Sequence, residues 1–191
     1  MSIYNCNVDI LLTIENYGSS MDISENSIGG KFMFSIGDMI YYPRHGAGII
    51  EGIEEKEVLT EKCKYYVIWI VLGDMRVMVP IEKTEIHGIR YITSKERIDD
   101  IYNILSGKTG CMHKSWSKRY RENEAIIGNG DVFEISELVK NLTVADRGKK
   151  LSTGERRMLE NVRQLLVSEL MLIMNESYEK MEEKVLGMIN Q

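Results

Sequence analysis

Cysteine and histidine are too few and too scattered in this 191-residue chain to indicate a disulfide framework or a metal site. The three cysteines, Cys6, Cys63 and Cys111, form no CxxC pair, and their number is odd. The three histidines show no HExxH or HxxxH spacing that would place two of them on one helix face. We therefore expect reduced thiols in a cytosolic protein that holds no metal and no cofactor.

Long apolar runs, a basic N-terminal region and enzyme motifs are also lacking. The longest apolar runs, such as Val67–Leu72, are far too short to span a bilayer, and no secretory signal is evident. A Walker A loop, a GxGxxG turn, a GxSxG elbow and the kinase motifs are all absent. The turn Arg44-His45-Gly46 has no evident nucleophile as partner. We predict a protein without catalytic residues, membrane partner or small-molecule substrate, and a small enzyme remains only as a distant alternative.

The overall composition indicates a globular protein with no excess of positive charge. Hydrophobic residues make up 43% and charged residues 28% of the chain, which suits one large domain or two small ones. The 24 Lys and Arg residues are outnumbered by 29 Asp and Glu residues, and the net charge is -5. Any contact with nucleic acid must therefore come from a local patch.

Residues 1–32 differ in character from the rest. The stretch 16–30 is rich in Gly, Ser, Asn and Asp, which is typical of a loop or a mobile tail. We expect residues 1–32 to be disordered or absent from the native protein, with Met33 as its natural start. The segment Gly29–Met33 can be encoded by a GGAGG run, a short spacer and ATG, the layout of a bacterial ribosome-binding site. An intact mass of the native protein that corresponds to a chain beginning at Ser2 would contradict this hypothesis.

Residues 33–92 contain successive runs of β-branched and aromatic residues with no helical pattern between them. Gly73-Asp74 predicts a tight hairpin turn, His45–Gly48 predicts a second turn, and charged residues fill positions 54–64. This spacing predicts a small, strongly bent antiparallel sheet or barrel of the SH3-like or Tudor-like size. The predicted strands are Met39–Tyr42, Ile49–Ile53, Tyr65–Leu72 and Met75–Pro80.

From residue 93 the apolar pattern changes to the 3.6-residue period of helices. Thr93–Glu96 and Ser152–Glu155 resemble capping boxes, and Asp131 with Glu134 marks another helix start. The pattern predicts an all-α bundle over residues 93–191, so the fold class is α+β. The predicted helices are those with inward residues Ile98 to Leu105, the segment from about Ser115 to Ile127, those that open at Asp131 and Ser152, and Glu176–Ile189.

Positive charge is concentrated in one part of the predicted bundle. Residues 108–163 carry twelve basic and eight acidic residues, whereas the remainder carries twelve basic and twenty-one acidic residues. Trp116 lies within this region near a predicted helix start, where a large flat side chain can wedge into a minor-groove base step. A solvated helix face and a half-buried packing tryptophan are the open alternatives. The basic cluster comprises Lys114, Lys118, Arg119, Arg121, Arg147, Lys149, Lys150, Arg156, Arg157 and Arg163.

From Phe34 to about Leu172 the chain resembles the CarD/CdnL family of bacterial RNA polymerase-binding transcription regulators. The matching segments occur in family order and cover most of the chain. They are Ile36-Gly37-Asp38, Tyr42-Pro43-x-His45-Gly46-Ala47, Gly73-Asp74-x-x-Val77-x-Val79-Pro80, Trp116-Ser117-x-Arg119-Tyr120, Gly130-Asp131-Val132 and Leu151-Ser152-x-Gly154-Glu155-x-Arg157-Met158-Leu159.

The resemblance implies a transcription regulator with two functional surfaces. A Tudor-like domain, residues 33–92, would bind the RNA polymerase β subunit, and a helical domain, residues 93–191, would contact promoter DNA at the upstream edge of the transcription bubble. The residue matching the family tryptophan, Trp116, would insert at the minor groove and stabilise the open complex. Such a protein would be cytoplasmic and bacterial, and would reach the nucleoid through RNA polymerase. The expected DNA-binding residues are Trp116, Lys114, Lys118, Arg119, Arg121, Lys149, Lys150, Arg156 and Arg157.

The expected polymerase-binding residues are Lys56, Arg76 and Met78. The family position at Lys56 is often basic, and the position at Met78 is basic in some relatives, so Arg76 can supply that charge here. Addition of a strand to an exposed sheet edge is the expected mode of docking. For Tyr65 and Trp69 core packing is favoured over a role as interface anchors. The main alternative function is a protein–protein interaction module without a direct DNA role.

Overall fold

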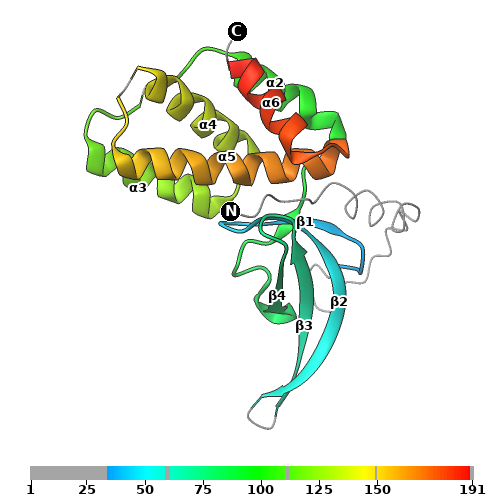
Figure 1. The fold of residues 1–191 in the computed structure, drawn as a ribbon. Coiled ribbons are helices and arrows are strands. Elements are labelled where there is room, and N and C mark those ends of the chain that lie inside the picture. The colour runs from blue at the N-terminus through cyan, green and yellow to red at the C-terminus, as the bar shows by residue number, and fades with distance from the viewer. Residues whose placement is uncertain (1–33, 59–60, 111, 149, 190–191) are drawn as a thin grey trace, which may run out of the picture.

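The computed structural model describes residues 34–58, 61–110, 112–148 and 150–189, so the expectations about residues 1–32 and the start at Met33 lie outside the described part. The chain forms an antiparallel sheet followed by a bundle of helices (Figure 1). The predicted α+β class is therefore confirmed. Figure 1 also shows the sheet hanging below the long helix α5, which runs along the base of the helical part.

The residues that the structure describes form a sheet of five strands in the order β4-β3-β2-β1-β5, and all neighbouring strands are antiparallel. One of its faces encloses a small apolar core because every second residue of each strand points the same way. This core contains Phe34, Ile40, Ile50, Tyr66, Ile68, Ile70, Val79 and Ile89. The strands are β1 (Met39–Tyr42), β2 (Gly46–Val58), β3 (Glu61–Ile70), β4 (Met75–Pro80) and β5 (Arg90–Tyr91).

The hairpin of β2 and β3 is longer than the sequence predicted. β2 begins at Gly46, inside the predicted turn, and the charged stretch 54–64 largely continues the two strands in regular register. Lys56 lies opposite Cys63 in this ladder, and Glu54 lies opposite Tyr65. The far end of the hairpin extends beyond the other strands, as Figure 1 shows, and the described residues within 54–64 contribute nothing to the apolar core, so they need no alternating apolar pattern. A bulge at Glu51 shifts the register there.

Within the described ranges five α-helices follow the sheet, with short 3₁₀ turns η1 (Ile81–Lys83) and η2 (Lys95–Arg97) before them. Ser152 and Glu155 form the predicted capping box, and the carboxylate of Asp131 accepts from two N–H groups at the next helix start. Thr93–Glu96 does not form the predicted capping box: the 3₁₀ turn η2 begins here with Ser94 as its N-cap residue but without a side-chain cap hydrogen bond, and α2 follows it directly. The helices are α2 (Ile98–Ser106), α3 (Trp116–Asn129), α4 (Val132–Arg147), α5 (Thr153–Met174) and α6 (Tyr178–Ile189).

The second face of the sheet and the helical bundle share one apolar core. Tyr41, Ala47, Ile49 and Trp69 of the sheet pack in the same cluster as the inward residues of the helices. Trp69 is 9% exposed and donates its indole N–H to Asp74, which confirms its predicted place in the core, whereas Tyr65 is only partly buried. The helical members include Ile101, Val132, Leu138, Met158, Leu159, Val162, Leu165, Leu166 and Leu170.

A buried ion pair joins the two parts of the molecule. Arg90 of β5 donates to both carboxylate oxygens of Glu169 on α5, at 2.7 and 2.9 Å. The same guanidinium donates to the carbonyl oxygen of Gly130 at the end of α3, and it lies 4.4 Å from the centre of the Tyr41 ring. The Thr93 backbone N–H donates to the Glu169 carboxylate. One side chain of the sheet therefore contacts both α5 and the turn between α3 and α4.

Candidate nucleic-acid interface

The first turns of α3 and α5 lie side by side at the end of the helical part farthest from α6 (Figure 1). Trp116 is the first residue of α3, and its side chain is 51% exposed. Its indole Nε1 donates to the hydroxyl of Ser152, the N-cap residue of α5, at 3.1 Å. A large aromatic ring is thus half exposed while its polar edge is bound to the neighbouring helix.

Tyr120 supports the indole from within α3. Four residues separate Tyr120 from Trp116, which places both on one helix face, and the two ring centres are 5.6 Å apart. The rings are tilted by 35° to each other. The first turn of α5 approaches the tyrosine closely, because a Cβ atom on Gly154 would lie 3.9 Å from its ring. The tryptophan ring therefore packs against Tyr120 of α3, and the first turn of α5 contacts Tyr120 in turn.

Glu155 holds the two helix starts together. Its carboxylate accepts from the Ser152 backbone N–H and hydroxyl at 3.0 and 2.8 Å and from Arg119 Nε of α3 at 2.6 Å. Burial alone would raise the pKa of Glu155, but the hydrogen bonds from Ser152 and the contacts of Arg119 outweigh it, so this pKa lies below its usual value. The carboxylate is therefore ionised at neutral pH, in an ion pair of which only 1% of the glutamate side chain is exposed.

Some of the basic residues expected at this surface pair with acidic side chains, and the remaining ones that the structure describes are exposed without such a partner in the described part. Arg119 is turned inward, with 15% of its side chain exposed, and also donates to the carbonyl oxygen of His113. Arg156 is exposed but pairs with Asp146 at 2.9 Å, and Lys118 lies 3.9 Å from Glu122. The other described members are exposed, while Lys149 lies outside the described residues. These other members are Lys114, Arg121, Lys150 and Arg157.

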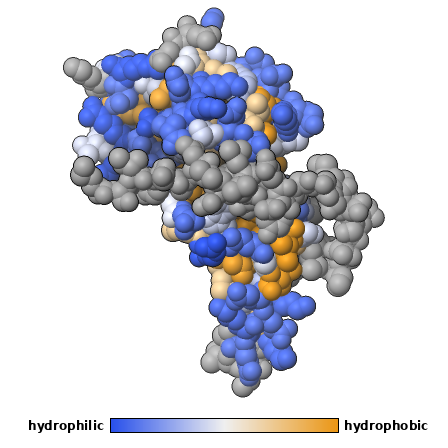
Figure 2. Space-filling view, turned by 45° about the vertical axis from the view of Figure 1, so that its right-hand side comes forward, coloured by the Kyte–Doolittle hydropathy of each residue, from blue (hydrophilic) through white to orange (hydrophobic). Residues whose placement is uncertain are grey.

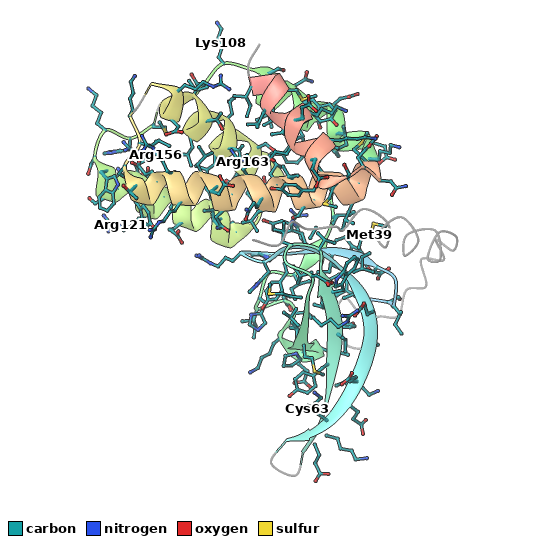
Figure 3. All side chains as sticks on the ribbon, in the orientation of Figure 1. Met39, Cys63, Lys108, Arg121, Arg156 and Arg163 are labelled. Atoms are coloured by element: carbon teal, nitrogen blue, oxygen red, sulfur yellow. The ribbon has the colours of Figure 1, made fainter. Side chains whose placement is uncertain are left out.

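Several of these cations are open to an anionic partner. Within the described part of the chain, Lys114, Lys150 and Arg157 make no ion pair, and Arg121 donates only to the carbonyl oxygen of Ser117. Figure 3 shows Arg121 and Arg156 toward the end of the helical part where α3 and α5 begin. Exposed cations around a half-exposed aromatic ring can neutralise phosphates while the ring contacts a base.

A second candidate surface lies on the sheet. Met78 and Arg76 of β4 pair with Val67 and Trp69 of β3, so the two side chains share one face. Lys56 of β2 reaches the same face, with its Nζ 2.9 Å from the sulfur of Met78. All three expected polymerase-binding residues therefore lie together. Figure 2 shows hydrophobic side chains on the sheet between the hydrophilic end of the hairpin and the helical part.

The edge of β4 completes this second surface. β4 pairs with β3 on one side and, among the described residues, with no strand on the other. Arg76 stands at this edge and donates through Nε and Nη2 to both carboxylate oxygens of Glu51, at 2.7 and 3.0 Å. An unpaired strand edge offers backbone groups to a partner strand. The surface is distant from the tryptophan, since Figure 3 places Cys63, opposite Lys56, at the far end of the sheet from Arg121.

No catalytic or metal-binding arrangement emerges from the described ranges. They contain no group of three His, Cys, Asp or Glu side chains arranged to hold a metal ion. His45 stacks 4.3 Å from Tyr42, and burial, followed by the nearby His87, lowers its pKa. Arg44 of the same turn pairs with Glu124 of α3 at 2.8 Å. In the part of the chain that the structure describes, no helix is both long and apolar enough to cross a membrane.

Sequence reasoning found the tryptophan but not the residues that hold it. The capping box at Ser152 was recognised as a helix start, yet nothing in the sequence connected it to Trp116, 36 residues away. The contact with Tyr120 was accessible, because a spacing of four residues places two side chains on one helix face. Arg119 was grouped with the open cations because its ion pair with Glu155 depends on the tertiary fold.

Comparisons with known proteins match both parts of the chain. Residues 34–93 match the family model described as "CarD-like/TRCF RID domain", and residues 100–186 match "CarD, C-terminal domain". A protein of Bacillus subtilis (strain 168) named "Putative transcription factor YdeB" is 41% identical over 141 residues. That alignment covers 74% of this chain and 92% of the relative.

Proposed function

The chain belongs to the CarD family of non-enzymatic transcription factors, and from this premise we propose that it binds RNA polymerase and promoter DNA at once. The sheet, within residues 33–92, binds the polymerase β subunit. The helical part, within residues 93–191, contacts DNA at the upstream edge of the transcription bubble and stabilises the open complex. The protein acts in the bacterial cytoplasm and reaches the nucleoid through polymerase.

Binding of polymerase is supported by the open edge of β4 and the residues beside it. Main-chain groups along such an edge can pair with a strand of the partner, which gives affinity without deep pockets. Lys56 and Arg76 place cations on the adjoining face, where Arg76 pairs with Glu51 and Lys56 lies 3.8 Å from Glu54, and Met78 lies beside Lys56. The family model described as "CarD-like/TRCF RID domain" matches residues 34–93, which include this strand edge and all three of these residues.

Contact with DNA is supported above all by one observation, the 51% exposure of Trp116, whose ring packs against Tyr120 where the first two turns of α3 and α5 carry the exposed cations Arg121 and Arg157. A flat apolar side chain can enter a partly unstacked base step from the minor groove. The surrounding lysines and arginines contact phosphates, which carry no base identity, so the contact is largely independent of sequence. The wedge binds melted, distorted DNA better than closed duplex and therefore shifts the equilibrium toward the open complex.

The net charge of -5 fits a DNA contact that depends on a tether. An acidic protein has little affinity for DNA on its own, because attraction to phosphates dominates such binding. Once the sheet is bound to polymerase at a promoter, the helical part experiences a high effective concentration of DNA. A small basic surface then suffices.

The test separates the two contacts by mutation of each surface in the full-length protein. Trp116→Ala removes a stacking contact of about 1–3 kcal/mol, so promoter complexes should dissociate about 5- to 150-fold faster. Its capture of the polymerase β subunit should be unchanged. The double variant Lys56→Glu, Arg76→Glu should instead lose capture of the β subunit. Promoter-complex lifetimes that Trp116→Ala leaves unchanged would refute the wedge.

The alternative of an interaction module without a DNA role draws no support from the tryptophan. That alternative expects a fully buried Trp116 and promoter effects that do not depend on salt. The indole is half exposed. A salt titration of promoter-complex lifetimes distinguishes the two, because contacts with phosphates weaken steeply as salt concentration rises.

A further inference from the structure

We propose that Ser152, Glu155 and Arg119 form a positioning network that fixes the direction of the Trp116 ring before DNA binds. The inference rests on the proposed function, because it assigns a role to residues that contact the wedge and not the DNA. It concerns one chain of contacts, from the buried ion pair through the hydroxyl to the exposed indole.

The hydroxyl of Ser152 uses all of its hydrogen-bonding capacity. It donates to Glu155 Oε2 at 2.8 Å, and it accepts from the Glu155 backbone N–H at 3.3 Å and from Trp116 Nε1 at 3.1 Å. A serine hydroxyl has one donor and two acceptor sites, so each site has a defined partner. The indole N–H has a single donor, and rotation of the ring away from Ser152 would break its bond.

Glu155 sets the direction in which the hydroxyl points. Its ionised carboxylate only accepts, so the hydroxyl hydrogen must turn toward Oε2 and the oxygen lone pairs toward the indole and the backbone. Arg119 fixes the carboxylate in turn, because it donates Nε to Oε1 at 2.6 Å and Nη1 to the His113 carbonyl oxygen at 2.8 Å. The contacts therefore lead from the buried Arg119–Glu155 ion pair, through the Ser152 hydroxyl, to the exposed ring of Trp116.

The start of α3 depends on these contacts because its own cap is incomplete. Ser115 is the N-cap residue of α3, but its side chain accepts no hydrogen bond from a backbone N–H of the helix. At α5, by contrast, the serine and glutamate satisfy each other's backbone N–H groups. The cap of α5 therefore holds two helix starts, its own and the one that carries the tryptophan.

A ring that is already oriented loses little freedom when it enters the base step. Immobilising a free side chain on binding weakens affinity by a factor of roughly 2 to 10. The network would remove this loss in advance, which is the general benefit of a preorganised site. Loss of the network should therefore shorten promoter-complex lifetimes by about that factor while the tryptophan itself remains present.

The experiment compares three serine variants of the full-length protein with Trp116→Ala. Ser152→Ala removes the hydroxyl, whereas Ser152→Thr keeps a hydroxyl and a good N-cap residue. Ser177→Ala is the matched control, because Ser177 accepts from the Lys180 backbone N–H at the start of α6, away from the tryptophan. We expect Ser152→Ala to shorten promoter-complex lifetimes about 2- to 10-fold, and the other two serine variants to leave them unchanged.

A spectroscopic readout separates positioning from stability. The chain contains two tryptophans, so its ¹⁵N NMR spectrum has two indole N–H signals, and Trp116→Ala identifies the relevant one. Ser152→Ala should shift this signal and lower its order parameter, whereas Ser152→Thr and Ser177→Ala should not. An order parameter unchanged by Ser152→Ala would overturn the positioning role, whatever the lifetimes.

The outcomes also distinguish this inference from the proposed function. If Trp116→Ala shortens promoter-complex lifetimes and Ser152→Ala does not, the wedge stands, and the proposed contribution of the network to DNA binding is refuted. If Trp116→Ala has no effect on lifetimes, the proposed DNA contact fails. The NMR comparison then decides by itself whether Ser152 holds the ring.

Discussion

Replacement of Glu169 by glutamine should destabilise the whole protein, because this carboxylate joins its two parts. Only 1% of the Glu169 side chain is exposed, and it accepts from two guanidinium nitrogens of Arg90 and from the Thr93 N–H. A glutamine offers one acceptor oxygen and turns an NH₂ group toward the donors of Arg90.

The size of the effect follows from the burial of the two partners. Breaking a fully buried ion pair costs about 3–5 kcal/mol, and a hydrogen bond to a charged group contributes about 1.5–3 kcal/mol. The Arg90 side chain is 30% exposed, so water screens part of the loss. We expect Glu169→Gln to lower the free energy of unfolding by about 2–3 kcal/mol. For a chain of this size, the melting temperature should fall by roughly 4–12 °C.

Urea denaturation followed by circular dichroism, together with calorimetry, measures both quantities. Glu176→Gln is the matched control, because Glu176, just before α6, forms an exposed pair with Lys180 of α6, and exposed pairs contribute about 0.2–1 kcal/mol. If Glu169→Gln unfolds at the same urea concentration as Glu176→Gln, the buried pair does not stabilise the fold.

Two further substitutions test the packing of the sheet and the titration of the network. Gly46→Ala should destabilise the fold by about 1–3 kcal/mol in urea, because Gly46 has φ of +93° and a Cβ would lie 2.8 Å from Leu72 and Ser168. Gly52→Ala, where a Cβ meets nothing within 4 Å, should change stability by no more than a few tenths of this, and equal losses would contradict the reasoning. The folded-state pKa of Glu155 lies below its unfolded value near 4.3, so its stabilisation should be complete above about pH 5 and disappear as the pH falls through the folded pKa. Urea midpoints of wild type and Glu155→Gln should therefore approach each other as the pH falls through the folded pKa, and a difference that stays constant throughout an acid titration would refute this assignment.

Local signals in the sequence predicted most elements of the fold. The capping box at Ser152 and the N-cap at Asp131 predicted two helix starts, because a cap depends only on neighbouring residues. The sequence does not predict the outer half of the β2–β3 hairpin, because most of its side chains are charged and no alternation of apolar and polar residues marks the strands. Its pairing depends on continuation of a ladder whose inner half is buried.

Contacts between distant residues could not be predicted in this way. Arg90 and Glu169 are 79 positions apart, and each taken alone resembles an ordinary surface charge. Arg119 was grouped with the DNA-facing cations, although Glu155 holds it, because a charge count does not say which cations have partners. The candidate surface at Trp116 was therefore predicted in composition, while the contacts that organise it required the fold.

The core shared by sheet and helices holds the two proposed contact surfaces at a fixed distance from each other. One surface is the tip of the sheet at the open edge of β4, and the other is the tip of the helical part at the Trp116 ring. Arg90, Glu169 and the residues around them join the two parts between these tips. On the proposed function, polymerase fixes one tip, and the other then meets the DNA at a set distance. A shift of about 3.4 Å along the duplex would bring the ring to the next base-pair step. The position of action would then be specified by length and not by base recognition.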